Sequence, residues 1–355
     1  MFSFNKTYKL PFKYNIPNCI DFHVQTVNYF KRYLKYFKRE MFILLNNQKK
    51  LEILKIIPRH TKILWINISA PSLGDSLMDL SSRVMLSDRS IDLFTDSKNA
   101  NLYFDDKYFR NIYTKVGDVK KVNYDLVIID SYSTRSMKIK VRIAPKVQYV
   151  GMFGFFNGPE VNRTLFSFHQ MNNLLGYIKD ECEIIEISKN HISISKKDEE
   201  IVKHLIPEKY IAIVLGGEWK YKTYEKWNEV IDKIIYDDKK LNVVLIGSVN
   251  ASRASKELLR NFPQCNFSNF VAKLSFNQTV EVIRHSEILL CSDGGLMHAA
   301  NAVNANIVSL FARLTGEILL TNNCISHNLY DRYDVNNILV KDVLSKYHEA
   351  KNNLN

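Results

Sequence analysis

Three loops of this 355-residue sequence bring glycines and charged side chains together just before a predicted helix. One of them, 292–298 (SDGGLMH), lies between apolar runs at 288–290 and 306–311 that predict buried parallel strands. Small residues from 296 to 303 predict a helix whose free N–H groups would face the loop and suit a phosphate. His298 lies one turn into that helix, where it could bind a ligand, cap the helix or pack in the core.

A second loop, 69–76 (SAPSLGDS), follows the apolar run 63–68 and precedes a helix predicted from about 76 to 86. Gly74 permits a close approach of the backbone, and Asp75 stands at the helix start. The spacing alone favours Asp75 as the N-cap of the helix; a carboxylate that faces a ligand is otherwise a candidate general base. The loop has neither the G-x-G-x-x-G pattern of dinucleotide sites nor the G-x-x-x-x-G-K pattern of P-loops.

The third loop, 216–223 (GGEWKYKT), follows the apolar run 210–215. Its paired glycines can bring the backbone near a ligand, and Lys220 or Lys222 could neutralise a phosphate. Lysines on such a loop are more often simply solvated.

Strands and helices alternate along most of the chain, which predicts the α/β class. The expected strands are 63–68, 90–94, 124–130 and 147–150 in a first sheet, then 210–215, 241–246, 288–290 and 306–311 in a second. We expect a Rossmann-like doubly wound domain at 61–185, another at 205–335 and a closing helix within 336–355. Ligands of such folds bind beyond the carboxyl ends of the strands, so a cleft between the two sheets would collect the three loops.

Residues 1–60 lack this alternation and contain no glycine, which marks them as an added segment. Apolar residues recur in it at spacings of three and four with basic residues between them; the apolar set is Val27, Phe30, Leu34, Phe37, Met41 and Leu44. The pattern predicts a basic amphipathic helix. We expect its apolar stripe to pack on the next domain; contact with a membrane surface or another subunit is the alternative.

The balance of 49 basic and 37 acidic residues gives a formal net charge of +12, which favours an anionic partner such as nucleic acid, an anionic membrane or a phosphorylated substrate. The five cysteines are widely spaced without a C-x-x-C pair, so the sequence indicates neither a disulfide framework nor a zinc site. The longest apolar run near the N-terminus, 41–45, is too short to span a bilayer. We expect a cytoplasmic protein, soluble or peripheral on a membrane.

The order and wording of the three loops resemble glycosyltransferase family 9, the ADP-heptose:lipopolysaccharide heptosyltransferases, which have the GT-B fold of two facing Rossmann-like domains. Residues 62–76 resemble the family's opening strand and S-x-x-G-D loop, with Pro71 as one extra residue. Residues 210–227 resemble its strand and K-R-W-P region, and 292–300 resemble its D-[ST]-G-x-x-H-[LI]-A element. The likeness continues to the C-terminus and leaves out residues 1–60.

The resemblance implies an inverting, metal-independent transfer of a heptose or related sugar from an ADP-sugar to a lipopolysaccharide or lipooligosaccharide core. Asp75 matches the family's base, and Lys222 its phosphate-neutralising lysine, with Lys220 as the register alternative. The residues implied to bind the donor are Gly216, Gly217, Lys222, Thr223, Asp293, Gly294, Gly295, Leu296 and His298. No cofactor beyond the nucleotide sugar is implied, since the chain has no D-x-D triplet and a helix dipole with a lysine can replace a cation.

Acceptor contacts are expected from loops of the first domain, near 131–142 and 151–163. Arg135, Arg142 and Arg163 could meet acidic groups there. The expected partners are a nucleotide sugar, an anionic glycolipid and the cytoplasmic face of the inner membrane, with no nucleic acid.

The sequence departs from the family where K-R-W-P appears as 222–225 (KTYE) and G-P-T-D as 312–315 (ARLT). The acid that holds the ribose in some members has no clear match in 248–255. Another nucleotide-sugar donor or a protein acceptor therefore stays open.

Two other classes of protein also stay open. The charge and the basic, aromatic segment 24–45 would suit a nucleic-acid-binding protein, although no RRM, KH, zinc-finger or helix-turn-helix signature is visible. An inactive GT-B scaffold would bind partners through its N-terminal helix.

Overall fold

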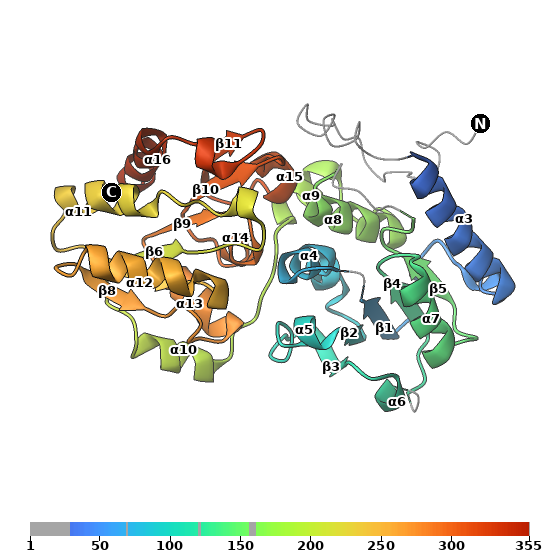
Figure 1. Cartoon of the computed structure of the whole chain (residues 1–355). Helices are drawn as coiled ribbons and strands as arrows, with labels where there is room; N and C mark the ends of the chain where they lie inside the picture. Colours follow the sequence, from blue (N-terminus) through green and yellow to red (C-terminus); the bar gives the residue numbers. More distant parts are fainter. Residues whose placement is uncertain (1–28, 69, 120–121, 156–160, 355) are drawn as a thin grey trace. The chain divides into compact units, whose positions relative to one another are not determined.

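The computed structural model describes residues 29–68, 70–119, 122–155 and 161–354 (Figure 1). The chain divides into two compact units, Met1–Ser188 and Lys189–Asn355, and each is built on its own parallel sheet. The predicted α/β class with two doubly wound sheets is confirmed.

The sheet of the first unit has five strands in the order β3-β2-β1-β4-β5, all paired in parallel. They are β1 (Lys62–Asn67), β2 (Ser90–Thr95), β3 (Phe109–Tyr113), β4 (Leu126–Ile129) and β5 (Tyr149–Gly151). The central strand β1 is buried at every residue but the first, as the continuous apolar sequence predicts for a parallel strand. The sequence pattern misses β3, because this edge strand mixes polar and apolar residues (FRNIY).

The helix predicted from about 76 to 86 is in fact two helices, α4 (Leu73–Asp79) and the 3₁₀ helix η2 (Ser81–Leu86). The longest helix after β5 in this unit is α8 (Arg163–Leu174). The other helices of this unit are α3 (Tyr29–Leu45), η1 (Lys49–Leu51), α5 (Ser97–Ala100), α6 (Val116–Val119), α7 (Thr134–Ile143) and α9 (Glu181–Ile187). Helix α7 packs on β1 and β4 (Figure 1).

Helix α3 confirms the predicted amphipathic helix, but the prediction that its apolar stripe packs on the next domain is wrong. Phe30, Leu34 and Phe37 are exposed at 68%, 48% and 54%, and Val27 lies outside the described residues. A different face of α3, which includes the buried Ile43, packs against α7. The chain after α3 runs beside β5, where the N–H of Ile53 donates to the carbonyl oxygen of Tyr149 at 2.9 Å.

The sheet of the second unit has six parallel strands in the order β11-β10-β9-β6-β7-β8. They are β6 (Ile211–Val214), β7 (Asn242–Ile246), β8 (Asn266–Asn269), β9 (Ile288–Ser292), β10 (Ile307–Ala312) and β11 (Ser326–Asp331). Its helices are α10 (Lys196–Lys203), η3 (Lys220–Lys222), α11 (Trp227–Asp237), η4 (Val249–Ala251), α12 (Ser252–Asn261), α13 (Phe276–His285), α14 (Gly295–Ala302), α15 (Gly316–Leu319), η5 (Val335–Asn337) and α16 (Val340–Asn352). The core joins the inner residues of the sheet to α11 and α16; Trp227, Ile231 and Val343 are among them.

Each sheet has one point where the strand order reverses. In the first sheet this switch lies between β1 and β4, and in the second between β6 and β9. Ligands of doubly wound sheets bind beyond the carboxyl ends of the strands at this point. The three candidate loops follow β1, β6 and β9, so each begins at a switch point of its own sheet.

Candidate functional site

Asp75 lies in the first turn of α4, beyond the carboxyl end of β1. The expectation that Asp75 caps this helix is wrong, because α4 begins at Leu73 and Ser72 is its N-cap. The Ser72 hydroxyl accepts from the N–H of Asp75 at 3.2 Å and donates to its Oδ2 at 2.5 Å. The half-buried carboxylate therefore lies at the helix N-terminus but does not serve as its N-cap.

Asp79, one turn after Asp75 on α4, lies in a buried polar network. Its Oδ1 accepts from Arg163 Nε at 2.7 Å, and its Oδ2 from Asn67 Nδ2 at 3.3 Å. Asn67 ends β1 and also accepts from the Ser76 hydroxyl at 3.1 Å. Burial raises the pKa of Asp79 to about 6, against the opposing effect of Arg163. The network ties α4, and with it Asp75, to the end of the central strand.

Sequence reasoning missed Asp79 and Asn67 as parts of this site. The spacing of Asp79, four residues after Asp75 on one helix, was the available signal for it. Asn67 carries a signal of the same kind, since it is a polar residue at the carboxyl end of an apolar strand.

The arginines expected to contact an acceptor have different surroundings. Arg163 begins α8, with its guanidinium paired to Asp79 and 4.3 Å from the centre of the Phe153 ring. Arg135 lies in the first turn of α7 and pairs with Asp96. Arg142 is exposed in the last turn of the same helix. Within the first unit, Arg142 is the one of the three that is not held by an aspartate in the described residues.

The glycines after β6 are required by neighbouring loops of the same unit. Gly216 has a φ of +76°, and a Cβ there would meet Asn250 Oδ1 at 2.8 Å. A Cβ on Gly217 would meet Thr223 Oγ1 at 2.6 Å. The Gly217 carbonyl also accepts from Asn250 Nδ2 at 2.7 Å, and Thr223 Oγ1 donates to the Trp219 carbonyl at 3.0 Å. These contacts fold the loop back on itself and leave Lys222 at the end of the short helix η3.

Lys222 forms an ion pair with Asp293, which joins the loop after β6 to the loop after β9. The Asp293 side chain is 4% exposed and that of Lys222 is 21% exposed. The N–H of Asp293 donates to the Leu310 carbonyl at 3.0 Å, which fixes this loop on β10. Lys220, the other lysine of η3, is exposed. The two lysines, which the sequence left as alternatives for phosphate contact, therefore differ: Lys222 is paired with Asp293, and Lys220 is exposed.

The N-terminus of α14 lies directly after Asp293. Its N-cap residue is Gly294, so no side chain caps the first-turn N–H groups of Gly295 and Leu296. A Cβ on Gly294 would meet nothing nearer than the Ser292 carbonyl oxygen at 3.9 Å. The backbone here is open on that side, unlike that of Gly216 and Gly217, and an anion could approach the helix end.

His298 is 4% exposed, one turn into α14. Its carbonyl oxygen accepts from Asn190 Nδ2 at 3.1 Å. His298 is therefore buried in the second unit, and Asn190 holds its backbone.

Arg313 is a second cation beside this site, and sequence reasoning missed it. It directly follows β10 and has a φ of +69°, a conformation that costs a non-glycine residue free energy. Its guanidinium carbon lies 3.6 Å from the centre of the Tyr221 ring, and Lys222 Nζ lies 5.8 Å from the same centre. The described residues provide no carboxylate partner for exposed Arg313. Its place at the end of a predicted strand, where the family pattern differs, was the available signal.

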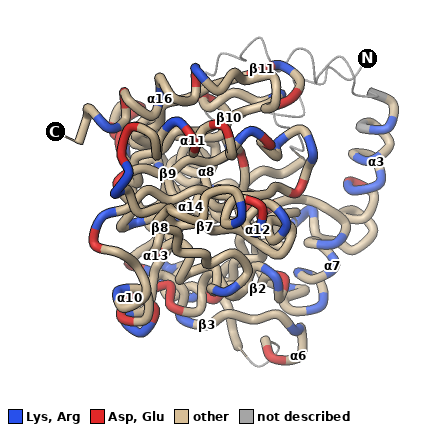
Figure 2. Tube along the Cα trace, turned by 60° about the vertical axis from the view of Figure 1, so that its left-hand side comes forward, with Lys and Arg blue, Asp and Glu red and all other residues tan. Residues whose placement is uncertain are grey.

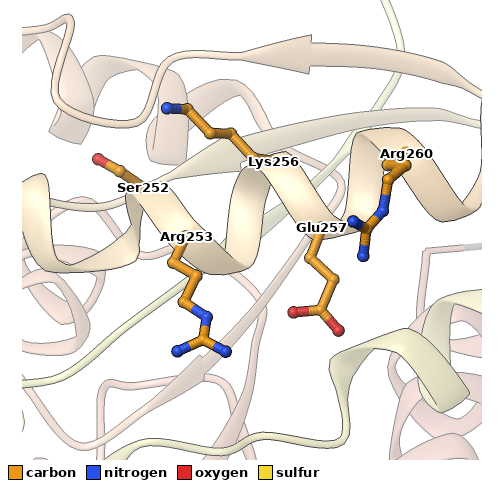
Figure 3. A pocket seen from close by; sticks show the side chains of 5 residues that line it. All are labelled: Ser252, Arg253, Lys256, Glu257 and Arg260. Carbon is orange, nitrogen blue, oxygen red and sulfur yellow. The ribbon is translucent and has the colours of Figure 1, made fainter.

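The second unit also has a surface hollow that none of the three candidate loops lines. It is lined by Ser252, Arg253, Lys256, Glu257 and Arg260. All five belong to α12, and Figure 3 shows Lys256 pointing to the opposite side from Arg253 and Glu257. A single solvated helix with divergent side chains does not enclose a ligand, so we do not place the site there. Among the described residues, no group of three or more His, Cys, Asp or Glu side chains could hold a metal ion.

Residues 156–320 match the family model described as glycosyltransferase family 9 (heptosyltransferase). A comparison with curated protein sequences finds no match.

Solved structures share the fold across most of the chain. A family 9 glycosyl transferase from Veillonella parvula DSM 2008 has a TM-score of 0.67 at 12% identity, covering 83% of this chain and 98% of its own. The ADP-heptose lps heptosyltransferase II of E. coli has a TM-score of 0.64 at 18% identity, covering 81% and 98%. The E. coli heptosyltransferase WaaC, solved with ADP, has a TM-score of 0.62 at 14% identity, covering 81% and 99%.

At these identities the likeness establishes the fold, two Rossmann-like units of the GT-B type. The family match adds the class of enzyme, since it includes the loops of Lys222 and Asp293 although it begins after Asp75. Residues 156–320 match glycosyltransferase family 9, and the chain is a glycosyltransferase.

Proposed function

We propose that the protein is an inverting glycosyltransferase that moves a heptose, or a related sugar, from an ADP-sugar to a lipopolysaccharide or lipooligosaccharide core. The observation that carries the proposal is the Lys222–Asp293 ion pair beside the uncapped N-terminus of α14. A cation and free N–H groups at a topological switch point are what a nucleotide diphosphate needs. The ADP moiety is proposed because two structural neighbours are described as an ADP-heptose enzyme and as an enzyme solved with ADP.

The donor's diphosphate would lie at the start of α14. The N–H groups of Gly295 and Leu296 would donate to phosphate oxygens there, and Asp293 would present the ammonium of Lys222 from the side. Negative charge grows on the ADP as its bond to the sugar breaks. The helix end and the lysine would stabilise that charge without a metal ion.

Asp75 would act as the general base on the acceptor. The acceptor oxygen forms a bond to the anomeric carbon from the face opposite the ADP, which inverts that centre, while the bond from this carbon to the ADP oxygen breaks. The acceptor's proton passes to Asp75, and the bonding electrons leave with ADP. Ser72, which donates to the Asp75 carboxylate, would keep it oriented toward the acceptor hydroxyl.

The acceptor would be anionic, and Arg135 and Arg163 begin helices near the carboxyl ends of the strands, whereas Arg142 lies in the last turn of α7, toward the other end of the sheet. Arg142 is exposed, and Arg135 and Arg163 are paired with Asp96 and Asp79. Arg135 and Arg163 would contact the acceptor only by sharing those carboxylates. The net charge of +12 would favour a phosphate-bearing glycolipid at the cytoplasmic face of the inner membrane.

Thermal unfolding with ADP, UDP and GDP tests the donor assignment, because a ligand that binds the folded state raises its stability. We expect ADP to raise the melting temperature by roughly 5 °C at a hundredfold excess over its Kd. A larger rise with UDP or GDP would replace ADP by another donor. No rise with any nucleotide, together with salt-sensitive RNA or DNA binding, would overturn the enzyme proposal in favour of nucleic-acid binding.

A further inference from the structure

Helix α3 carries an exposed apolar face. Phe30, Tyr33, Leu34, Phe37 and Leu44 are between 45% and 68% exposed, although each is large and apolar or aromatic. At 100° per residue these five side chains occupy one side of the helix, with Met41 in the middle of the same side. Large apolar residues clustered in this way mark an interaction surface, whereas single exposed ones do not.

The opposite side of α3 attaches the helix to the first unit. Ile43 is 1% exposed in the core of that unit, and the Tyr36 and Phe155 rings pack edge to face with centroids 4.6 Å apart. The inward face of α3 is therefore packed against the rest of the first unit. The outward apolar face is exposed and is a candidate surface for a binding partner.

The charges along α3 identify that partner as anionic. Lys31, Lys35 and Lys38 are exposed along one flank of the apolar face, and Figure 2 shows basic residues repeating along the helix. The one acidic residue of α3, Glu40, is half-buried and lies 3.5 Å from Lys49. Two copies of this face brought together would place their lysine rows near one another, which disfavours a dimer.

We propose that α3 lies in the plane of an anionic membrane surface, with Phe30, Leu34 and Phe37 inserted among the lipid acyl chains and the lysines on the headgroups. Aromatic and leucine side chains on one face with lysines beside them are the pattern of interfacial helices. Each lysine near an anionic surface adds electrostatic attraction, and its long stem lets the ammonium reach the headgroups. None of the helices in the described parts of the chain is long and apolar enough to cross a bilayer.

The inference stands on α3 alone and does not require the proposed donor or acceptor. It extends the proposed function, because docking would bring a sugar-transferring enzyme to lipid-linked acceptors. Lipid binding and nucleotide binding are measured separately, so failure of one leaves the other intact.

Flotation with vesicles tests the proposal. The full chain is mixed with phosphatidylcholine vesicles and with vesicles that also contain phosphatidylglycerol. We expect flotation with the anionic vesicles alone, weakened by high salt. The triple variant Phe30→Ser/Leu34→Ser/Phe37→Ser should reduce the partition coefficient by on the order of tenfold or more, and Lys31→Gln/Lys35→Gln/Lys38→Gln should also weaken it.

Leu54→Ser is the matched control, since Leu54 is 79% exposed in the same unit but lies outside α3. Leu54→Ser should float like the wild type, and all variants should keep the wild-type melting temperature because their side chains are exposed. A wild type that does not bind anionic vesicles, or an apolar variant that binds them equally well, overturns the proposal. Light scattering that shows a dimer in the wild type and a monomer in the apolar variant, without lipid binding, would assign the face to self-association and also overturn it.

Discussion

Lys222 and Asp293 form an ion pair although they come from different loops, one after β6 and one after β9. The carboxylate is almost fully buried and the lysine about one-fifth exposed, so the ammonium is fixed in position at the N-terminus of α14. A phosphate that binds there would pay little entropy for ordering the lysine side chain.

Replacing Lys222 with methionine should weaken ADP binding by about 10- to 100-fold, because a charge-assisted contact to phosphate is lost. It should also lower the melting temperature, since Asp293 is left as a buried, unpaired charge. The double variant Lys222→Met/Asp293→Asn should recover stability but not binding. Calorimetric titration with ADP measures the affinity, and Lys220→Met, on the same short helix, is the control that should leave it unchanged. Equal losses at Lys220 and Lys222 would contradict the assignment.

Replacing Arg313 with glycine should raise the stability of the second unit and lower its affinity for ADP. Arg313→Gly removes the cost of a positive φ and should stabilise the second unit by about 1 kcal/mol or less, while weakening ADP binding by roughly tenfold. Arg313→Ala should weaken binding without the gain in stability. Asn304, with a φ of +56°, gives the comparison: Asn304→Gly should change stability slightly and binding not at all. Chemical denaturation and ADP titration on the same samples decide this, and unchanged ADP affinity in both Arg313 variants would remove Arg313 from the site.

Asp75→Asn should lower the rate of sugar transfer on the order of 10³-fold, because the amide cannot take the acceptor's proton. ADP affinity should not change, since the residue acts on the acceptor. Asp118, an exposed aspartate in the first turn of α6, is the matched control, and Asp118→Asn should transfer sugar at the wild-type rate. Near-normal transfer by Asp75→Asn would exclude Asp75 as the base.

Asp79 should make stability depend on pH. Its pKa is about 6 in the folded chain, above the ordinary value of 3.8, so the folded state binds the proton more tightly. The resulting stabilisation is fully present below pH 3.8 and is lost as the pH rises through 6. Relative to Asp79→Asn, the wild-type free energy of unfolding should fall by on the order of 2–3 kcal/mol between pH 4 and 7. Urea denaturation across that range measures the difference, and a rise instead of a fall would mean that the ion pair with Arg163 outweighs burial.

The sequence predicted the strands that are buried on both faces, because parallel strands leave long apolar runs such as that of β1. It missed three edge strands, β3, β8 and β11, whose polar side chains interrupt the pattern. It also predicted the loops at the two switch points. The domain boundaries and the functions of the loop residues remain predictions.

Relations between distant side chains could not be read from the sequence. The pairing of Lys222 rather than Lys220 with Asp293 depends on the fold of η3, which local spacing does not fix. The wrong N-cap at Asp75 and the wrong inward face of α3 have a similar cause. Ser72 rather than Asp75 takes the N-cap position of α4, and Ile43 rather than the predicted stripe faces the core. Tertiary contacts select between such alternatives, and the local sequence does not show them.

The most direct test of the account is mass spectrometry of glycolipid acceptors incubated with the purified protein and ADP-heptose, UDP-glucose or GDP-mannose. The account predicts that the acceptor mass increases by one heptose with ADP-heptose, and that Asp75→Asn and Lys222→Met reduce this product strongly. No product from ADP-heptose, with transfer from a UDP- or GDP-sugar instead, would contradict the proposed donor, and no transfer from any donor would contradict the proposed activity.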